Sequence, residues 1–187
     1  MMADDLDLDT VRRLLQRIAK RDEAALYTLH RQYARKIYAF VIHRCGDAQM
    51  ADVIVSETLF EVWNKPASFR GESKFSTWLL GVARYKMLSA LRRPDRNHDD
   101  IEDHSEVLVS ADPAPQEVIE KAQDAKDVQD CLKRLSAVQR ECMHLVFYED
   151  MTVEEIARLQ DVPDGTVKTR LFHARKNMRE CLQPRAG

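Results

Sequence analysis

The chain is poor in glycine and has no long apolar run. Only five of its 187 residues are glycine, and 44% are hydrophobic, as in an ordinary globular protein. No stretch of 18 apolar residues is present, and the first ten residues, MMADDLDLDT, are acidic rather than basic and then apolar. We therefore expect a globular, mainly helical protein of the cytoplasm, with neither a secretory signal nor a membrane-spanning segment.

Cysteine is also sparse, and its spacing is unlike that of the common metal sites. Cys45, Cys131, Cys142 and Cys181 form no C-x-x-C pair. His43 lies two residues from Cys45, and on a helix the two side chains would point in different directions. We expect no metal, no other cofactor, and no disulfide in a cytoplasmic protein. The thiols are expected to be structural.

Signs of catalysis are missing as well. The sequence contains no glycine-rich phosphate loop, no paired-carboxylate site and no nucleophile with a recognisable base. An enzyme is therefore not expected.

The net charge of −2 conceals a strong segregation of charge along the chain. Residues 24–93 carry eleven basic and five acidic side chains, whereas residues 94–125 carry two and ten. Three prolines in the acidic stretch favour an extended linker. We predict an all-α protein of two small helical domains, 1–93 and 126–187, joined by an acidic linker at 94–125. The linker is either a solvated spacer or a polyanion that occupies a basic nucleic-acid channel, and the sequence leaves both open.

Residues 152–182 predict a helix-turn-helix. Thr152 and Glu155 form a capping box that begins a short helix, and the run from Gln160 to Pro163 ends that helix. Asp164 or Thr166 can cap a second helix. The apolar residues of the second helix recur at three- and four-residue steps and predict one buried stripe: Val167, Leu171, Ala174, Met178 and Leu182.

The polar side of this second helix has the chemistry of a DNA-recognition helix. Residues 166–185 hold six Lys and Arg but one acid, which suits a phosphate backbone. Ammonium, hydroxyl, imidazole and ring groups can reach base edges in a major groove. The candidate DNA contacts are Lys168, Thr169, Arg170, Phe172, His173 and Lys176. The alternative is an amphipathic helical hairpin with a solvated basic face.

The N-terminal domain is predicted to contain helices at about 24–45, 48–64 and 77–93. The apolar spacing predicts an inner face that includes Ala51, Ile54 and Leu59 on the second helix and Leu88 and Leu91 on the third. The loop ASFRGESKFS before the third helix mixes aromatic rings with cations, which is typical of single-strand capture. Alternatively, the loop is an exposed connection whose phenylalanines pack into the core of the domain. The candidate DNA contacts of the loop and third helix are Phe69, Arg70, Lys74, Phe75, Trp78, Arg84 and Lys86.

Two stretches resemble one protein family. WNKPASFRGESKFSTWLLGVARYKMLSALRR resembles the promoter-melting helix and preceding loop of extracytoplasmic-function (ECF) sigma factors, in which F-x-x-W-L and an I-A-R-like step are typical. DVPDGTVKTRLFHARKNMRECL is similar to their C-terminal recognition helix, with its G-T-V-K/R-S-R-L-x-x-A-R pattern. The resemblance spans about residues 24–93 and 126–183, in the family's order.

The resemblance implies a non-catalytic transcription initiation factor. Such a factor binds the β′ clamp and β flap of bacterial core RNA polymerase, melts the −10 element with its N-terminal domain and reads the −35 element with its C-terminal domain. The loop around Phe69 to Phe75 would capture a flipped base. The runner-up is a helix-turn-helix regulator that acts without joining the holoenzyme.

One segment departs from the family pattern. Where the family has an A-E-D-L-V-Q-E-like segment that binds core polymerase, this chain has ADVIVSE, so the resemblance implies core binding by Asp52, Ser56 and Glu57. Val53 replaces an acid, and losing one charge pair typically costs on the order of 2–5 kcal/mol. A phosphate on Ser56 or Thr58 would restore negative charge, as is thought for a kinase-activated subgroup. Regulation by a Ser/Thr kinase or by an anti-sigma protein is left open.

Overall fold

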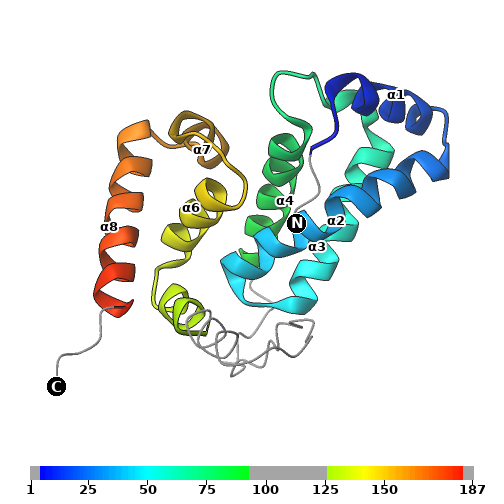
Figure 1. Ribbon diagram of the computed structural model, residues 1–187. Coiled ribbons are helices and arrows are strands. Elements are labelled where there is room, and N and C mark those ends of the chain that lie inside the picture. The colour runs from blue at the N-terminus through cyan, green and yellow to red at the C-terminus, as the bar shows by residue number, and fades with distance from the viewer. Residues whose placement is uncertain (1–4, 93–125, 183–187) are drawn as a thin grey trace, which may run out of the picture. The chain divides into compact units, whose positions relative to one another are not determined.

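The computed structural model describes residues 5–92 and 126–182, and every regular element in these ranges is a helix (Figure 1). The predicted all-α class is confirmed. The chain divides into two compact units, with the boundary outside the described residues. The predicted acidic linker also lies outside them.

Within residues 5–92, the N-terminal unit is a bundle of four α-helices. They are α1 (Leu8–Ala19), α2 (Glu23–Cys45), α3 (Ala48–Asn64) and α4 (Phe75–Leu91), with a short 3-10 helix, η1 (Pro66–Ser68), before the loop. α2 lies against α1, α3 and α4, and α3 also packs on α4. The predictions of the helices now called α2 and α3 are confirmed within one residue at each end, whereas α4 begins two residues before the predicted start.

Aspartates begin the first three helices. The carboxylates of Asp7, Asp22 and Asp47 each accept backbone N–H groups from the first turn of α1, α2 and α3. Gly46 ends α2 with a φ of 72°, a left-handed conformation that glycine adopts without steric penalty. By contrast, Lys74 at the start of α4 offers no side-chain cap. The first turn of α4 therefore depends on tertiary contacts.

The apolar periodicity places α2 and α3 correctly but α4 only in part. The buried side of α3 includes Ala51, Ile54 and Leu59, as predicted. On α4, Met87 is fully buried while Leu91, expected to point inward, is 39% exposed. The helix carries apolar residues on several sides, so its period alone left the inner face ambiguous.

The C-terminal unit contains the predicted helix-turn-helix. A helical segment at 126–133 precedes α6 (Ala137–Phe147), α7 (Val153–Gln160) and α8 (Asp164–Leu182). Both hydrogen bonds of the Thr152–Glu155 capping box are present, at 3.2 and 2.8 Å. Val167, Leu171 and Ala174 are buried as expected, against α6 and α7. Leu182, at the end of the predicted stripe, is 43% exposed.

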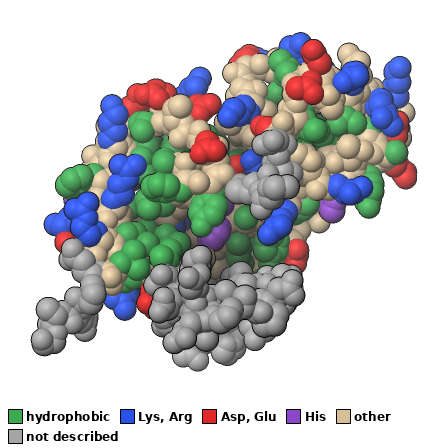
Figure 2. Space-filling model, in the orientation of Figure 1, with side chains coloured by type: hydrophobic (Ala, Val, Ile, Leu, Met, Phe, Trp, Pro, Cys, Tyr) green, Lys and Arg blue, Asp and Glu red, His purple; other side chains and the backbone are tan. Residues whose placement is uncertain are grey.

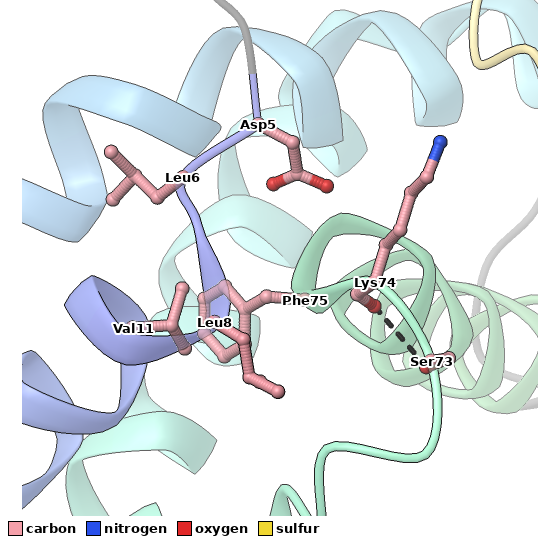
Figure 3. A pocket seen from close by; sticks show the side chains of 7 residues that line it. All are labelled: Asp5, Leu6, Leu8, Val11, Ser73, Lys74 and Phe75. Atoms are coloured by element: carbon pink, nitrogen blue, oxygen red, sulfur yellow. Dashed lines mark hydrogen bonds between the residues drawn. The ribbon is translucent and has the colours of Figure 1, made fainter.

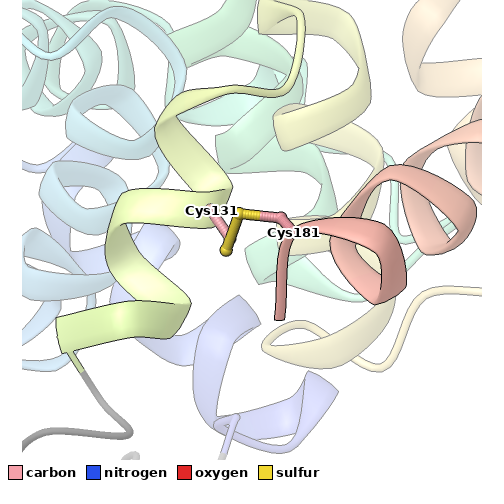
Figure 4. The surroundings of a disulfide bond; sticks show 2 residues. All are labelled: Cys131 and Cys181. Carbon is pink, nitrogen blue, oxygen red and sulfur yellow. A yellow bond between two sulfur atoms is a disulfide. The ribbon is translucent and has the colours of Figure 1, made fainter. Parts of the chain in front are cut away.

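A disulfide joins Cys131 to Cys181, so the expectation of free thiols is wrong for this pair. It connects the segment at 126–133 to the last turn of α8 (Figure 4). The two Cα atoms lie 5.8 Å apart although 50 residues separate them in sequence. The expectation rested on spacing and compartment, and neither reports how α8 returns toward the start of its unit. Cys45 and Cys142 are free.

We expect the disulfide to stabilise the C-terminal unit by about 4 kcal/mol, because it closes a loop of roughly 50 residues in the unfolded chain. Both tryptophans, Trp63 and Trp78, belong to the N-terminal unit, so tryptophan fluorescence would not report on unfolding of the C-terminal unit. Amide hydrogen exchange of α6 and α8 should accelerate in Cys131→Ser or on addition of a thiol reductant. Cys45→Ser is the control, and equal protection with and without reductant would contradict a stabilising role.

Candidate nucleic-acid interface

The exposed side of α8 carries five of the six residues predicted to read DNA. Phe172, with 65% of its surface exposed, lies next to His173. In Figure 2, Lys and Arg side chains gather over the part of the C-terminal unit formed by α8. The exposed residues are Lys168, Thr169, Phe172, His173 and Lys176. The geometry therefore offers ammonium, hydroxyl, imidazole and ring groups on one helix face, opposite a buried stripe.

Arg170, the sixth predicted residue, is half-buried and differently engaged. Its Nη1 donates to Gln160 Oε1 at 2.6 Å, and this oxygen also lies 3.5 Å from the Cys142 thiol, which donates to it. The guanidinium thus connects α8 to α7 rather than extending freely into solvent. Charge and sequence position alone could not distinguish it from the exposed cations nearby.

The two phenylalanines of the N-terminal loop lie in the core. Phe69 is 9% and Phe75 2% exposed, and their ring centroids are 5.0 Å apart in an edge-on arrangement. Trp78 packs 5.6 Å from both, and Tyr33 lies 5.3 Å from Phe75. The rings therefore fix the loop to the bundle, which is the alternative that the sequence left open.

The four cations of the N-terminal unit that are predicted to contact DNA lie in the loop and on α4. Arg70 and Lys74 are exposed, whereas Arg84 and Lys86 on α4 are half-buried. Lys86 Nζ lies 3.4 Å from Glu61 Oε2. The hydrogen bond from Lys65 and the charge of Lys86 hold the pKa of Glu61 below its usual value. Arg70 and Lys74 are the cations most open to a phosphate.

The N-terminal segment contributes a carboxylate that sequence reasoning missed. Asp5 Oδ1 accepts from the Tyr33 hydroxyl and Asp5 Oδ2 from the Ser76 hydroxyl, both at 2.5 Å. The backbone N–H of Leu6 donates to Tyr33 Oη at 3.1 Å. Burial and the hydrogen bond to Asp5 raise the pKa of Tyr33 far above its ordinary value. The carboxylate connects the segment before α1 to α2 and to the first turn of α4.

A separate surface on α3 carries the residues predicted to bind polymerase. Asp52, Ser56 and Glu57 are exposed, together with Val53 at 40% and Phe60 at 63%. The Ser56 hydroxyl donates to the Asp52 carbonyl at 3.1 Å. The surface therefore combines two acids with two large apolar side chains.

Thr58, the second candidate for phosphorylation, does not belong to this surface. It is fully buried in the helix bundle, and its hydroxyl oxygen has no hydrogen-bond partner. A kinase could reach it only if α3 moved.

The described residues contain neither a membrane-spanning helix nor a cluster of metal ligands. Among residues 5–92 and 126–182, no helix has the length and apolar character needed to cross a membrane. In the same ranges, no three His, Cys, Asp or Glu side chains gather as metal ligands would.

Two family models match the chain, one on each unit. Residues 29–97 match "Sigma-70 region 2", and residues 125–178 match "Sigma-70, region 4". The matched stretches include the loop and α4 in the first unit and the helix-turn-helix in the second.

Similar curated proteins align over nearly the whole chain. The RNA polymerase sigma-H factor of Pseudomonas aeruginosa is 28% identical over 182 residues, covering 91% of this chain and 93% of the relative. The ECF RNA polymerase sigma factor SigK of Mycobacterium tuberculosis is 28% identical over 183 residues, covering 94% of each.

Solved structures share this helical fold. The sigma factor RpoE of Bartonella quintana, in complex with the anti-sigma factor NepR, gives a TM-score of 0.66 at 25% identity and covers 85% of this chain and 97% of its own. CnrH, in complex with the cytosolic domain of CnrY, gives a TM-score of 0.60 at 18% identity and covers 92% of this chain and 97% of its own. Since the motifs, the helix-turn-helix and the matched regions all agree in order and position, the chain belongs to the sigma-70 family of transcription initiation factors, among its ECF members.

Proposed function

We propose that residues 1–93 of this sigma factor bind core RNA polymerase and the −10 element, and that residues 126–187 bind the −35 element, with 94–125 as the linker. The observation that carries this assignment is the two-sided α8: a buried apolar stripe and an exposed row of DNA-compatible groups. The polymerase supplies the chemistry, so the chain itself is not an enzyme, and it acts in the cytoplasm where the polymerase is.

At the −35 element, the exposed residues of α8 contact different parts of the DNA according to their chemistry. Lys168 and Lys176 carry charges that suit phosphates or guanine edges, and the Phe172 ring suits a thymine methyl group. Thr169 and His173 add hydrogen-bonding groups. Arg170 holds α8 against α7 through Gln160 and supports the reading side indirectly.

At the −10 element, the exposed cations Arg70 and Lys74 hold phosphates while the ring cluster keeps the loop in place. Trp78 is half-buried, so part of its ring surface remains available to a base. Arg84 and Lys86 continue the positive potential along α4. Phe69 and Phe75 act as supports of the loop in this assignment.

Core polymerase meets the exposed side of α3. Asp52 and Glu57 supply two acids, and Val53 and Phe60 add apolar area to the contact. Since aromatic side chains are enriched at the centre of protein interfaces, Phe60 is a suitable anchor. Because Val53 stands where the family has an acid, this surface binds polymerase more weakly unless negative charge is added.

Phosphorylation by a Ser/Thr kinase would add that charge, and exposure favours Ser56 over Thr58. Ser56 lies on the polymerase-binding side beside Asp52 and Glu57, whereas Thr58 is buried. An anti-sigma protein is the second mode of regulation to test, since RpoE of Bartonella quintana is seen bound to one.

The proposed function is tested by titrating labelled chain into purified bacterial core RNA polymerase. Saturable binding that is displaced by another sigma factor supports it. A chain that binds duplex DNA but never polymerase would favour the regulator that acts outside the holoenzyme.

Replacing Lys168 by alanine should weaken binding of the holoenzyme to −35 duplex DNA about tenfold, the discrimination typical of one good base or phosphate contact. Affinity measured over a range of salt concentrations distinguishes a phosphate contact from a base contact. Loss of a phosphate contact reduces the slope of affinity against salt concentration by roughly one unit, whereas loss of a base contact does not. Lys133→Ala, a lysine on the segment at 126–133, is the control. Unchanged affinity in Lys168→Ala would remove this residue from the −35 site.

Ser56→Glu should tighten binding to core polymerase by about tenfold, because it places a negative charge beside Val53, which stands where the family has an acid. Thr58→Glu should instead destabilise the N-terminal unit by roughly 3 kcal/mol or more, since an unpaired charge would be buried. Tryptophan fluorescence during denaturation and the polymerase titration give the two readouts. Thr28→Glu is the matched control, because Thr28 is exposed and donates to the Ala24 carbonyl as Ser56 does to Asp52. Tight polymerase binding by a stable Thr58→Glu would contradict the choice of Ser56.

A further inference from the structure

The C-terminal end of the loop before α4 is attached to the N-terminal segment of the chain. Ser76, in the first turn of α4, is 6% exposed and donates to Asp5 at 2.5 Å, a contact that spans 71 residues. The other oxygen of Asp5 accepts from Tyr33, which is 1% exposed. One carboxylate therefore ties the segment before α1, the middle of α2 and the start of α4 together.

The same loop is supported by α1 at its turn. Gly71 has a φ of 78°, and a β-carbon there would lie 3.3 Å from Arg12 Nη2 and 3.5 Å from Leu8 Cδ1. The backbone at Gly71 thus passes directly over two side chains of α1. η1, at the other side of the loop, also lies against α1.

The space between the two attachments is not filled by side chains. A cavity of about 340 Å³ lies there, and Leu8, Val11 and Phe75 form its apolar side (Figure 3). Asp5 projects toward the cavity from one side, and Ser73 and Lys74 lie along the loop on the other. Because the loop is not packed solidly on this side, its position depends on the few contacts that hold it.

The start of α4 also lacks a local source of stability. Lys74 precedes the helix without a capping hydrogen bond. A carboxylate near the N-terminus of a helix is favourable to the helix dipole, and Asp5 is bonded to the second residue of α4. Asp5, 71 residues away in sequence, thus brings a negative charge to the start of α4 and holds it there through the Ser76 hydroxyl.

We propose that Asp5 is a positioning residue for recognition of the −10 element, holding the loop at 69–75 and the start of α4 in the form that receives the unpaired promoter strand. The inference rests on the proposed function of the N-terminal unit. A loop that is already ordered loses less conformational freedom on binding, so the preformed arrangement raises affinity without any contact between Asp5 and DNA. Asp5 and α1 lie outside the region that matches the family model, which begins at residue 29.

The test uses holoenzyme assembled from core polymerase and wild-type or variant chain. Its probe is a fluorescent single strand carrying the −10 element of a promoter selected from random DNA by transcription with wild-type holoenzyme. Asp5→Ala removes the carboxylate, and Ser76→Ala removes one of the two hydroxyls that donate to it. The double variant completes a double-mutant cycle between these two residues. Asp9→Asn, an exposed acid in the first turn of α1, is the matched control for charge.

Asp5→Ala should bind the −10 strand about tenfold more weakly, the loss expected when the hydrogen bonds from Ser76 and Tyr33 to this carboxylate no longer order the site. Binding to core polymerase and to −35 duplex should stay within twofold of wild type, and Asp9→Asn should match wild type throughout. Ser76→Ala should weaken −10 binding by itself and add nothing in the Asp5→Ala background. Hydrogen exchange should accelerate in residues 69–76 while the centre of α3 keeps its protection.

Two results would overturn the inference, and they differ from failure of the proposed function. Wild-type affinity for the −10 strand in both Asp5→Ala and Ser76→Ala would show that the tie has no positioning role. Equal losses for the −10 strand, the −35 duplex and core polymerase would show only a general loss of stability. If wild-type holoenzyme itself does not bind the −10 strand, the assignment of the N-terminal unit falls, and the role of Asp5 with it.

Discussion

The N-terminal unit depends on the packing of four rings around the start of α4. Phe75 lies 5.3 Å from Tyr33, 5.0 Å from Phe69 and 5.6 Å from Trp78. Since Phe69 begins the loop at 69–75 and Phe75 ends it, one cluster holds both ends of this connection against α2. Buried aromatic pairs of this kind contribute roughly 0.5–1.5 kcal/mol beyond the area they bury. The exposed cations Arg70 and Lys74 are thereby presented at fixed ends rather than on a free loop.

The C-terminal unit fixes its DNA-facing helix by other means. The apolar stripe of α8 packs on α6 and α7, and the Arg170–Gln160 hydrogen bond adds a polar connection. The disulfide between Cys131 and Cys181 secures the last turn of α8. Together these contacts hold one side of the helix and leave the other side to solvent.

Local patterns predicted much of this fold, and long-range contacts account for what they missed. The apolar period predicted α2, α3 and α8, and the Thr152–Glu155 pair predicted the start of α7, because each signal lies within a few residues. The ties of Asp5 to Ser76 and of Cys131 to Cys181 join residues 71 and 50 positions apart, which no periodicity reports. The mixed composition of the loop at 69–75 likewise could not tell a ring that meets DNA from a ring that fills the core.

The central claim is that this chain directs RNA polymerase to promoters, and mapping transcription starts tests it most directly. Core polymerase with and without the chain would transcribe fragmented bacterial DNA, and the 5′ ends of the products would be sequenced. We predict new starts that appear only with the chain and share two sequence elements, near −35 and −10, at constant spacing. Identical sets of starts with and without the chain, at concentrations where the chain is saturating, would contradict the account.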